Sequence, residues 1–161
     1  ADRLRHDARY RPLAILGSEL PFPFELAPSA IDVPGIDAGT NSTMPLLESW
    51  GIPARLTSLA GFPGCHDGFV TDLADRWLRT LSPAELAEVK IFTCGPTPML
   101  KAVAALAERY GVACEVSLEE FMACAVGGCA GCTVPILTGT GKAMKRVCVD
   151  GPVFDAKTVA W

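Results

Sequence analysis

Short apolar runs alternate with segments of helical periodicity from residue 12 to residue 117, so strands followed by helices are expected. The expected strands cover residues 12–18, 54–60, 90–95 and 112–117. The expected helices cover residues 43–51, 69–81, 82–89 and 97–111. Residues 21–43 are rich in Pro, Gly, Ser and Asn, which predicts a long irregular loop. This alternation predicts an α/β fold with a parallel sheet and helices on its faces.

Residue types at the ends of the helical segments support these helices. Ser82 followed by Pro83 is a typical helix start, and we expect Thr43 and Thr97 to cap their helices in the same way. Gly111 is expected to end the longest of the helices. The sequence therefore marks where most of the helices begin and end.

The pattern changes after Ser117, where glycine-rich turns and short β segments replace the alternation. We therefore expect two parts: a partial, Rossmann-like nucleotide-binding domain over residues 1–116, and a small module over residues 117–161. In the second part, the segment from Pro135 to Val147 has a turn-rich tip, TGTGKA, and is expected to resemble a hairpin.

Four cysteines in the second part have a distinctive spacing. They form C-x4-C-x2-C in the stretch CAVGGCAGC, and after fifteen intervening residues a fourth cysteine follows in RVCVDG. They are Cys124, Cys129, Cys132 and Cys148. This is the spacing of the ligands of a plant-type [2Fe–2S] cluster, in which each iron takes two thiolates. The hairpin-like segment is expected to bring the fourth cysteine back to the other three.

A loop that carries three such ligands must wrap closely around a small object. Gly127, Gly128 and Gly131 lie between the cysteines, where glycine permits a positive φ and close approach of the backbone. Their amides are expected to point at the sulfurs, and hydrogen bonds of that kind tune a cluster's potential. A structural zinc site is the alternative, although zinc ribbons usually have two C-x2-C pairs and this spacing does not fit them.

Composition narrows the choice of partners and compartment. The chain has 161 residues, 50% of them hydrophobic, with a formal net charge of −4 and a pI of about 5.1. We do not expect an acidic chain to bind nucleic acid or a membrane surface, and no apolar run is long enough to span a bilayer. The odd number of cysteines, seven, indicates reduced thiols and a cytoplasmic setting. The opening ADRLRHDARY is typical of the tail of a helix, so we expect a fragment or a trimmed product.

Two strand ends are candidate parts of a nucleotide site, because ligands bind outside the carboxyl ends of parallel strands. One is CGPTPM, where the following helix start presents amides to a phosphate or ribose, and the other is GSE. The candidate contacts are Gly17, Ser18, Cys94, Gly95, Pro96 and Met99. If an adenosine ribose binds at GSE, Glu19 disfavours a 2′-phosphate and so favours NADH over NADPH. Tight structural turns are the alternative for both segments, and no G-x-G-x-x-G fingerprint is present.

Three segments match a known family when they are taken together. SLEEFMACAVGGCAGCTVP, followed by MKRVCVDGPVFDA, is the most specific of them. CGPTPMLKAV is similar to a nicotinamide-binding motif, and GCHDGFVTDL is similar to the loop and helix that precede it. The chain thus resembles, from about Pro12 to Trp161, the electron-transfer subunit of bacterial dihydroorotate dehydrogenase in the ferredoxin-reductase superfamily.

The resemblance implies an electron path and a set of partners. In such enzymes a partner subunit oxidises dihydroorotate to orotate on FMN, and electrons pass through a [2Fe–2S] cluster to FAD, which reduces NAD⁺. The resemblance assigns the four cysteines to the cluster and places Cys94, Gly95 and Pro96 beside the nicotinamide. It also implies a hetero-oligomer with the flavin dehydrogenase, and it points to no catalytic residue in this chain.

The chain departs from the family pattern in three ways. The flavin-binding β-barrel with its R-x-Y-S motif is missing, and so is the glycine-rich turn after the first strand of the nucleotide domain. We therefore do not expect this chain alone to bind FAD, and we expect its NAD site to be incomplete. Ala125 stands where glycine is common in the cysteine loop. The alternatives are an electron-transfer subunit of a hydrogenase or ferredoxin–NAD(P) type, a zinc-stabilised interaction module, and a redox sensor.

Overall fold

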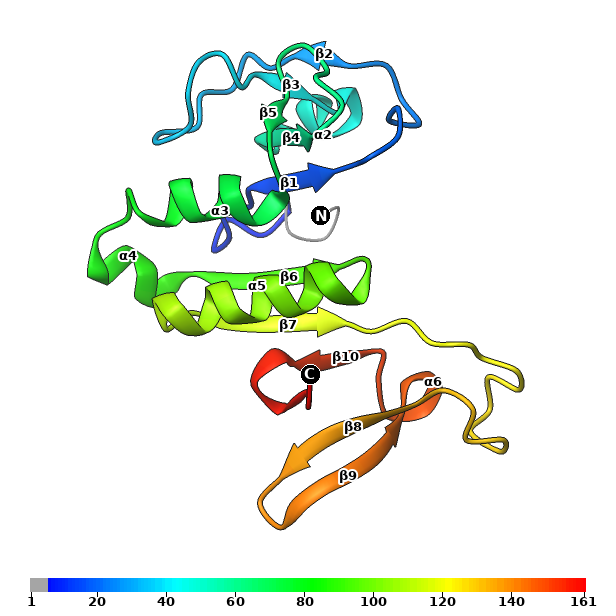
Figure 1. Cartoon of the computed structure of the whole chain (residues 1–161). Coiled ribbons are helices and arrows are strands. Elements are labelled where there is room, and N and C mark those ends of the chain that lie inside the picture. The colour runs from blue at the N-terminus through cyan, green and yellow to red at the C-terminus, as the bar shows by residue number, and fades with distance from the viewer. Residues whose placement is uncertain (1–5) are drawn as a thin grey trace. The chain divides into compact units, whose positions relative to one another are not determined.

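The computed structural model describes residues 6–161, and the chain divides into two compact units, Ala1–Thr80 and Leu81–Trp161 (Figure 1). Each unit has a three-stranded sheet of its own that contains parallel strands, so the expected α/β fold with parallel strands is confirmed, although the strands are divided between two sheets. The strand–helix–strand segment before the cysteines packs with them in the second unit. The expected division into a nucleotide-binding part, residues 1–116, and a small second module, residues 117–161, stays a prediction.

The first unit is built around a parallel sheet with the order β1–β4–β5. Its strands are β1 (Ala14–Gly17), β4 (Ala54–Ser58) and β5 (His66–Asp67). The central strand β4 is buried along its whole length. The helix α3 (Val70–Leu78) contacts β1 and β4 and buries Leu73 and Leu78, as its apolar face predicts.

The long segment expected over residues 21–43 is irregular but anchored. It contains the short antiparallel pair β2 (Ala27–Pro28) and β3 (Ser42–Thr43), and α2 (Pro45–Ser49) follows it. The Glu48 carboxylate accepts hydrogen bonds from the Ser29 hydroxyl at 2.8 Å and from the Ala30 amide at 2.7 Å. The buried Arg55 guanidinium donates to the Ile31 carbonyl at 2.7 Å. Burial lowers the pKa of Arg55, and the charges of Glu48 and Asp32 oppose that shift.

The second unit has the sheet order β10–β7–β6. Its elements are α4 (Pro83–Glu88), β6 (Lys90–Cys94), α5 (Thr97–Tyr110), β7 (Ala113–Ser117), β8 (Thr133–Thr138), β9 (Gly141–Arg146), α6 (Val147–Asp150), β10 (Val153–Asp155) and the 3₁₀ turn η1 (Ala156–Thr158). β6 and β7 are parallel, whereas β10 returns antiparallel to β7. β8 and β9 form the expected hairpin. Residues 118–132, between β7 and β8, contain neither helix nor strand.

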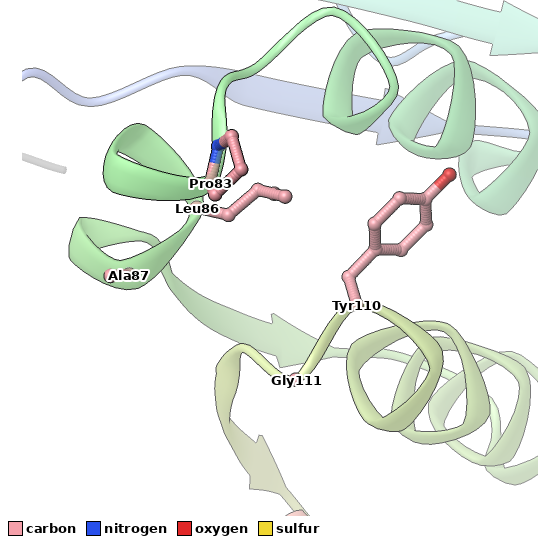
Figure 2. A pocket seen from close by; sticks show the side chains of 5 residues that line it. All are labelled: Pro83, Leu86, Ala87, Tyr110 and Gly111. Atoms are coloured by element: carbon pink, nitrogen blue, oxygen red, sulfur yellow. The ribbon is translucent and has the colours of Figure 1, made fainter.

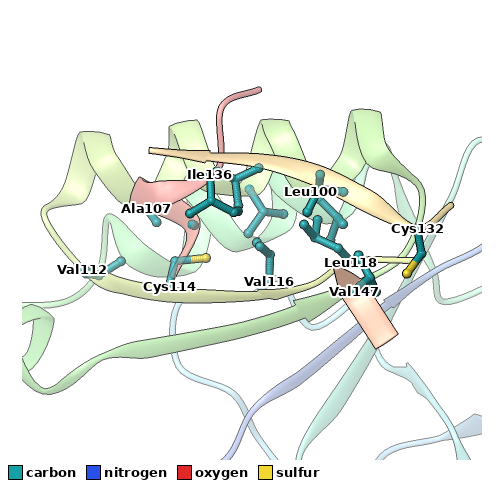
Figure 3. Packing of buried hydrophobic residues seen from close by; sticks show 13 residues of the cluster. Leu100, Ala107, Val112, Cys114, Val116, Leu118, Cys132, Ile136 and Val147 are labelled. Atoms are coloured by element: carbon teal, nitrogen blue, oxygen red, sulfur yellow. The ribbon is translucent and has the colours of Figure 1, made fainter. Parts of the chain in front are cut away.

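One hydrophobic core holds the second unit together (Figure 3). It joins α5 and β7 to the hairpin, to α6 and to η1, so that segments far apart in the sequence share one interior. Cys132 and Val147, which flank the hairpin, are both members of this core, with 2% and 0% of their surface exposed. The core therefore fixes the place where the two ends of the hairpin meet.

Several helix ends are confirmed and two are wrong. Ser82 caps α4 and accepts a hydrogen bond from the Glu85 amide at 3.3 Å, and Gly111 ends α5 in the left-handed region. Thr43 lies in β3 instead of capping a helix. Thr97 is the first residue of α5, since Pro96 already occupies the capping position and its fixed φ suits a helix start.

The chain opening and the helix lengths complete the description. Residues 6–10 form turns, and residues 1–5 of the expected helix tail lie outside the described residues. Across residues 6–161, the structure contains no helix that is both long and apolar enough to cross a membrane.

Candidate iron–sulfur cluster site

The hairpin β8–β9 brings the third and fourth cysteines together. Its register pairs Thr133 with Arg146, so Cys132, just before β8, lies opposite the start of α6, which carries Cys148. The Val147 amide donates to the Cys132 carbonyl at 3.0 Å and closes this end of the ladder. The expectation that a hairpin returns Cys148 to the other cysteines therefore has a structural basis.

The four thiols lie as two neighbouring pairs. The Cys129 thiol lowers the pKa of Cys124, and the Cys132 thiol raises the pKa of Cys148, so the thiols act on one another in these two pairs. The charge of Cys124 also raises the pKa of Cys148, so the two pairs are electrostatic neighbours. Cys132 is buried and Cys129 is exposed. Among residues 6–161, no three His, Cys, Asp or Glu side chains are grouped closely enough to surround a single metal ion.

Backbone amides stabilise negative charge on Cys124. The Cys129 amide donates to Cys124 Sγ at 3.4 Å and is the largest of several hydrogen bonds that lower the pKa of Cys124 to about 6. The amides of Val126 and Gly128 and the thiol of Cys129 act in the same direction. The loop is thus preorganised for a thiolate, which is the form that binds a metal.

The second pair shares its charge unequally. Backbone hydrogen bonding by Cys148 is the largest cause that lowers the pKa of Cys132, followed by the bond between the two side chains. The same side-chain bond raises the pKa of Cys148, and the Gly127 amide opposes that rise. The protein therefore stabilises the anion of Cys132 and disfavours that of Cys148.

The unusual backbone of the loop falls mainly on alanines. Ala125 and Ala130 have φ values of 54° and 53°, a region that costs a residue with a side chain about 1 kcal/mol. Gly127, with φ of 79°, is the only one of the three loop glycines in the left-handed region. The departure noted at Ala125 is therefore a site of backbone strain.

Arg146 is a part of the site that sequence reasoning missed. Its Nη1 donates to the Gly127 carbonyl at 3.1 Å, while its backbone amide and its Nε donate to Asp150 Oδ2 at 2.8 and 3.3 Å. A Cβ on Gly127 would lie 2.7 Å from Val149 Cγ2 and 3.1 Å from Arg146 Nη1, so the loop passes close to α6. The available signal was the Arg-x-x-x-Asp spacing around Cys148 in RVCVD.

In the cluster-free chain, we expect Cys124 to react with iodoacetamide much faster at pH 7 than Cys114. A pKa of about 6 leaves Cys124 mostly as the thiolate at pH 7, whereas burial raises the pKa of Cys114 to about 11 and keeps it as the thiol. Mass spectrometry of peptides after timed alkylation measures both rates. The Cys124 rate should level off above about pH 7, and a rate that still rises tenfold per pH unit at pH 8 contradicts the described loop.

The candidate nucleotide residues are divided between the units. Gly17 ends β1 in the first unit, where a Cβ would lie 2.7 Å from Val70 Cγ1 and 3.0 Å from Thr57 Oγ1. Close packing of α3 therefore accounts for this glycine. The Ser18 hydroxyl donates to the Leu20 carbonyl at 2.7 Å, which makes a local turn. The hydrogen bond supports the alternative that this strand end is a structural turn, and a role of Gly17 and Ser18 in nucleotide binding stays a prediction.

The other candidates surround the start of α5 in the second unit. Cys94 is exposed at the end of β6, and Pro96 is the capping residue of α5. Met99 packs against the core, and its methyl group would lie 2.6 Å from a Cβ on Gly95. This strand–turn–helix arrangement has the form expected of a nucleotide-binding strand end, and its ligand stays a prediction.

Two pockets described below contain none of the predicted site residues. One, of about 260 Å³, lies between α4 and the end of α5 (Figure 2). It is lined by Pro83, Leu86, Ala87, Tyr110 and Gly111. The other, of about 200 Å³, lies beside Arg55 and the anchored loop of the first unit.

The four-cysteine loop and the strand–helix–strand unit beside it are similar to parts of known oxidoreductase electron-transfer subunits. Residues 119–160 match the iron–sulfur cluster binding domain of dihydroorotate dehydrogenase B. The resemblance to the electron-transfer subunits of this enzyme is confirmed.

Curated relatives carry the same description, "Dihydroorotate dehydrogenase B (NAD(+)), electron transfer subunit". The relative from Caldanaerobacter subterraneus subsp. tengcongensis is 48% identical over 69 residues, which are 43% of this chain and 28% of the relative. That from Shouchella clausii is 41% identical over 88 residues, 54% of this chain and 30% of the relative. The relative from Bacillus velezensis is 40% identical over 95 residues, which are 58% of this chain and 32% of the relative. The chain thus matches about a third or less of the length of these relatives.

A solved structure is similar to a larger part of the chain. It is described as an NADH-dependent reduced ferredoxin–NADP oxidoreductase, studied for flavin-based electron bifurcation. The TM-score is 0.56 with 28% sequence identity, and the match covers 74% of this chain and 39% of that one. The mixed α/β fold with parallel strands is therefore of a ferredoxin–NADP oxidoreductase type.

Proposed function

We propose that this chain carries electrons through a [2Fe–2S] cluster, between a flavin dehydrogenase that oxidises dihydroorotate and an FAD that reduces NAD⁺. The observation that carries the proposal is the arrangement of Cys124, Cys129, Cys132 and Cys148 as two thiol pairs in the segment that matches the cluster-binding family. The described relatives, electron transfer subunits of an NAD⁺-dependent dihydroorotate dehydrogenase, support the choice of partner and acceptor.

Each thiol pair is suited to one iron. In this proposal Cys124 and Cys129 bind one iron and Cys132 and Cys148 bind the other, since each iron takes two thiolates. When bound, such a cluster accepts and releases single electrons. The amides around Cys124 offset the negative charge on sulfur, and the core around Cys132 excludes water from one side. The exposed side at Cys129 leaves room for a redox partner to approach.

The pairing also favours iron over zinc. A structural zinc ion is surrounded tetrahedrally by all four ligands at once, at about 2.3 Å from each sulfur. Two neighbouring pairs of thiols suit two metal positions, and the C-x4-C-x2-C spacing does not fit the two C-x2-C pairs of a zinc ribbon. A zinc-stabilised interaction module is therefore the weaker alternative.

A second oxidoreductase role has a specific observation in its favour. The similar solved structure is a ferredoxin–NADP oxidoreductase, so the same module in a ferredoxin–NAD(P) or hydrogenase system is the alternative. The two differ in the electron donor. Reduction of the complete complex by dihydroorotate supports the leading proposal, whereas reduction by ferredoxin alone supports the alternative. A cytoplasmic site of action belongs to the same proposal.

Anaerobic purification followed by metal and sulfide analysis tests the proposed cluster. We expect about two iron atoms and two acid-labile sulfides per chain, with an EPR signal that appears on reduction by dithionite. The control is the same preparation after treatment with a chelator and acid, which removes both. Stoichiometric zinc without labile sulfide would overturn the electron-transfer proposal.

A further inference from the structure

Arg146 joins the two parts of the chain that carry the candidate ligands. From its place at the end of β9 it reaches the Gly127 carbonyl, between Cys124 and Cys129, at 3.1 Å. The same guanidinium and the Arg146 backbone amide are held by Asp150 Oδ2, at the end of α6. One side chain thus connects the loop of the first three cysteines to the helix of the fourth.

The hydrogen bond from Arg146 to the Gly127 carbonyl also affects the Gly128 amide, which belongs to the same peptide unit. A peptide unit is planar and trans, so the Gly128 amide points away from the Gly127 carbonyl. That amide is one of the backbone groups that lower the pKa of Cys124. A guanidinium that fixes the carbonyl therefore also aims the amide at a candidate ligand sulfur. The ion pair with Asp150 limits the rotation of the guanidinium and places its charge at the site.

We propose that Arg146, anchored by Asp150, is a positioning residue that locks the Gly127–Gly128 peptide against the cluster and sets the cluster's reduction potential. This inference rests on the proposed function, since it requires a cluster at the four cysteines. The charges act in opposite directions, because the site gains negative charge on reduction: Arg146 favours the reduced state and Asp150 disfavours it.

A set of four variants of the iron-loaded chain tests the inference by redox titration monitored by EPR. Arg146→Met removes the charge and the clamp, so the potential should fall and a chelator should remove iron about tenfold faster. Asp150→Asn leaves the charge of Arg146 uncompensated, so the potential should rise. The double variant should lie between the two. Arg146→Lys keeps the charge but cannot bridge both partners, so it should lose iron faster than the wild type with a smaller fall in potential.

The matched control is Arg79→Met, which breaks another i,i+4 ion pair, with Asp75 at 2.7 Å, in the first unit. It should leave the potential and the rate of iron loss unchanged. If Arg146→Met does not take up iron, Arg146→Lys and Asp150→Asn still report both the reduction potential and the rate of iron loss. The inference about Arg146 is overturned if the reduction potentials of the Arg146 and Asp150 variants shift in the same direction, or if Arg146→Met behaves like the control. Neither result contradicts the proposed function. A wild-type chain without labile sulfide overturns the proposed function as well.

Discussion

A Cys129→Ser chain is expected to lose the visible absorbance and the EPR signal of the cluster, with at least about tenfold less labile sulfide per chain than the wild type. A serine hydroxyl keeps its proton near neutral pH, so it replaces a thiolate poorly as a ligand. Cys129 also supplies the amide that donates to Cys124 Sγ, but this amide is unchanged in the variant. The expected loss therefore reports the sulfur itself.

Cys94→Ser is the matched control for that variant. Cys94 is also exposed, but it lies at the end of β6 and outside the cysteine loop. The control should keep its full content of iron and sulfide. Since Cys129 is exposed, the Ser substitution removes no core contact, and circular dichroism should show an unchanged helix and strand content of the chain. Full cluster content in Cys129→Ser contradicts the assigned ligand set.

Leu100→Ala is expected to destabilise the second unit by about 2–5 kcal/mol, a large part of the stability of a small domain. Leu100 is 1% exposed and lies in the core that joins α5 to β7, the hairpin and α6 (Figure 3). Truncation leaves a cavity that α5 and β7 cannot close without losing their other contacts. Urea unfolding, monitored by hydrogen exchange at the β7 amides, measures the second unit separately.

Leu137→Ala provides the comparison within the same unit. Leu137 is 45% exposed on β8, so its truncation should change stability by no more than about 0.5 kcal/mol. The Leu100 variant should also bind iron less tightly, because Cys132 belongs to the same core. A loss below about 1 kcal/mol for Leu100→Ala, or equal losses for the two variants, is inconsistent with this core.

Local signals in the sequence predicted most of the elements. The apolar periodicity located α3 and α5, and Ser82 with Pro83 located the start of α4. These features depend on neighbours within one or two helical turns. The cysteine spacing likewise identified the ligand set that is now proposed, because a tight loop around a small cluster imposes short, fixed separations.

Features that depend on distant partners were missed. β10 has three residues, and its pairing with β7 follows from the course of the chain after α6. The separation of β1 and β6 into different sheets likewise depends on packing that no periodicity records. At the site, Arg146 was missed because its partner Gly127 lies before the hairpin and its role requires the hairpin to be closed.

Cys132 serves two purposes, since it is a candidate ligand and also a member of the interior of the second unit. Metal binding contributes folding free energy when a ligand set and a core share residues. Oxidative loss of iron would then leave a thiol pair without its metal beside Val147 and loosen the hairpin that crosses the core. A molecule damaged by oxygen would thus become a better substrate for cellular proteases, and its lifetime would depend on the condition of its cofactor.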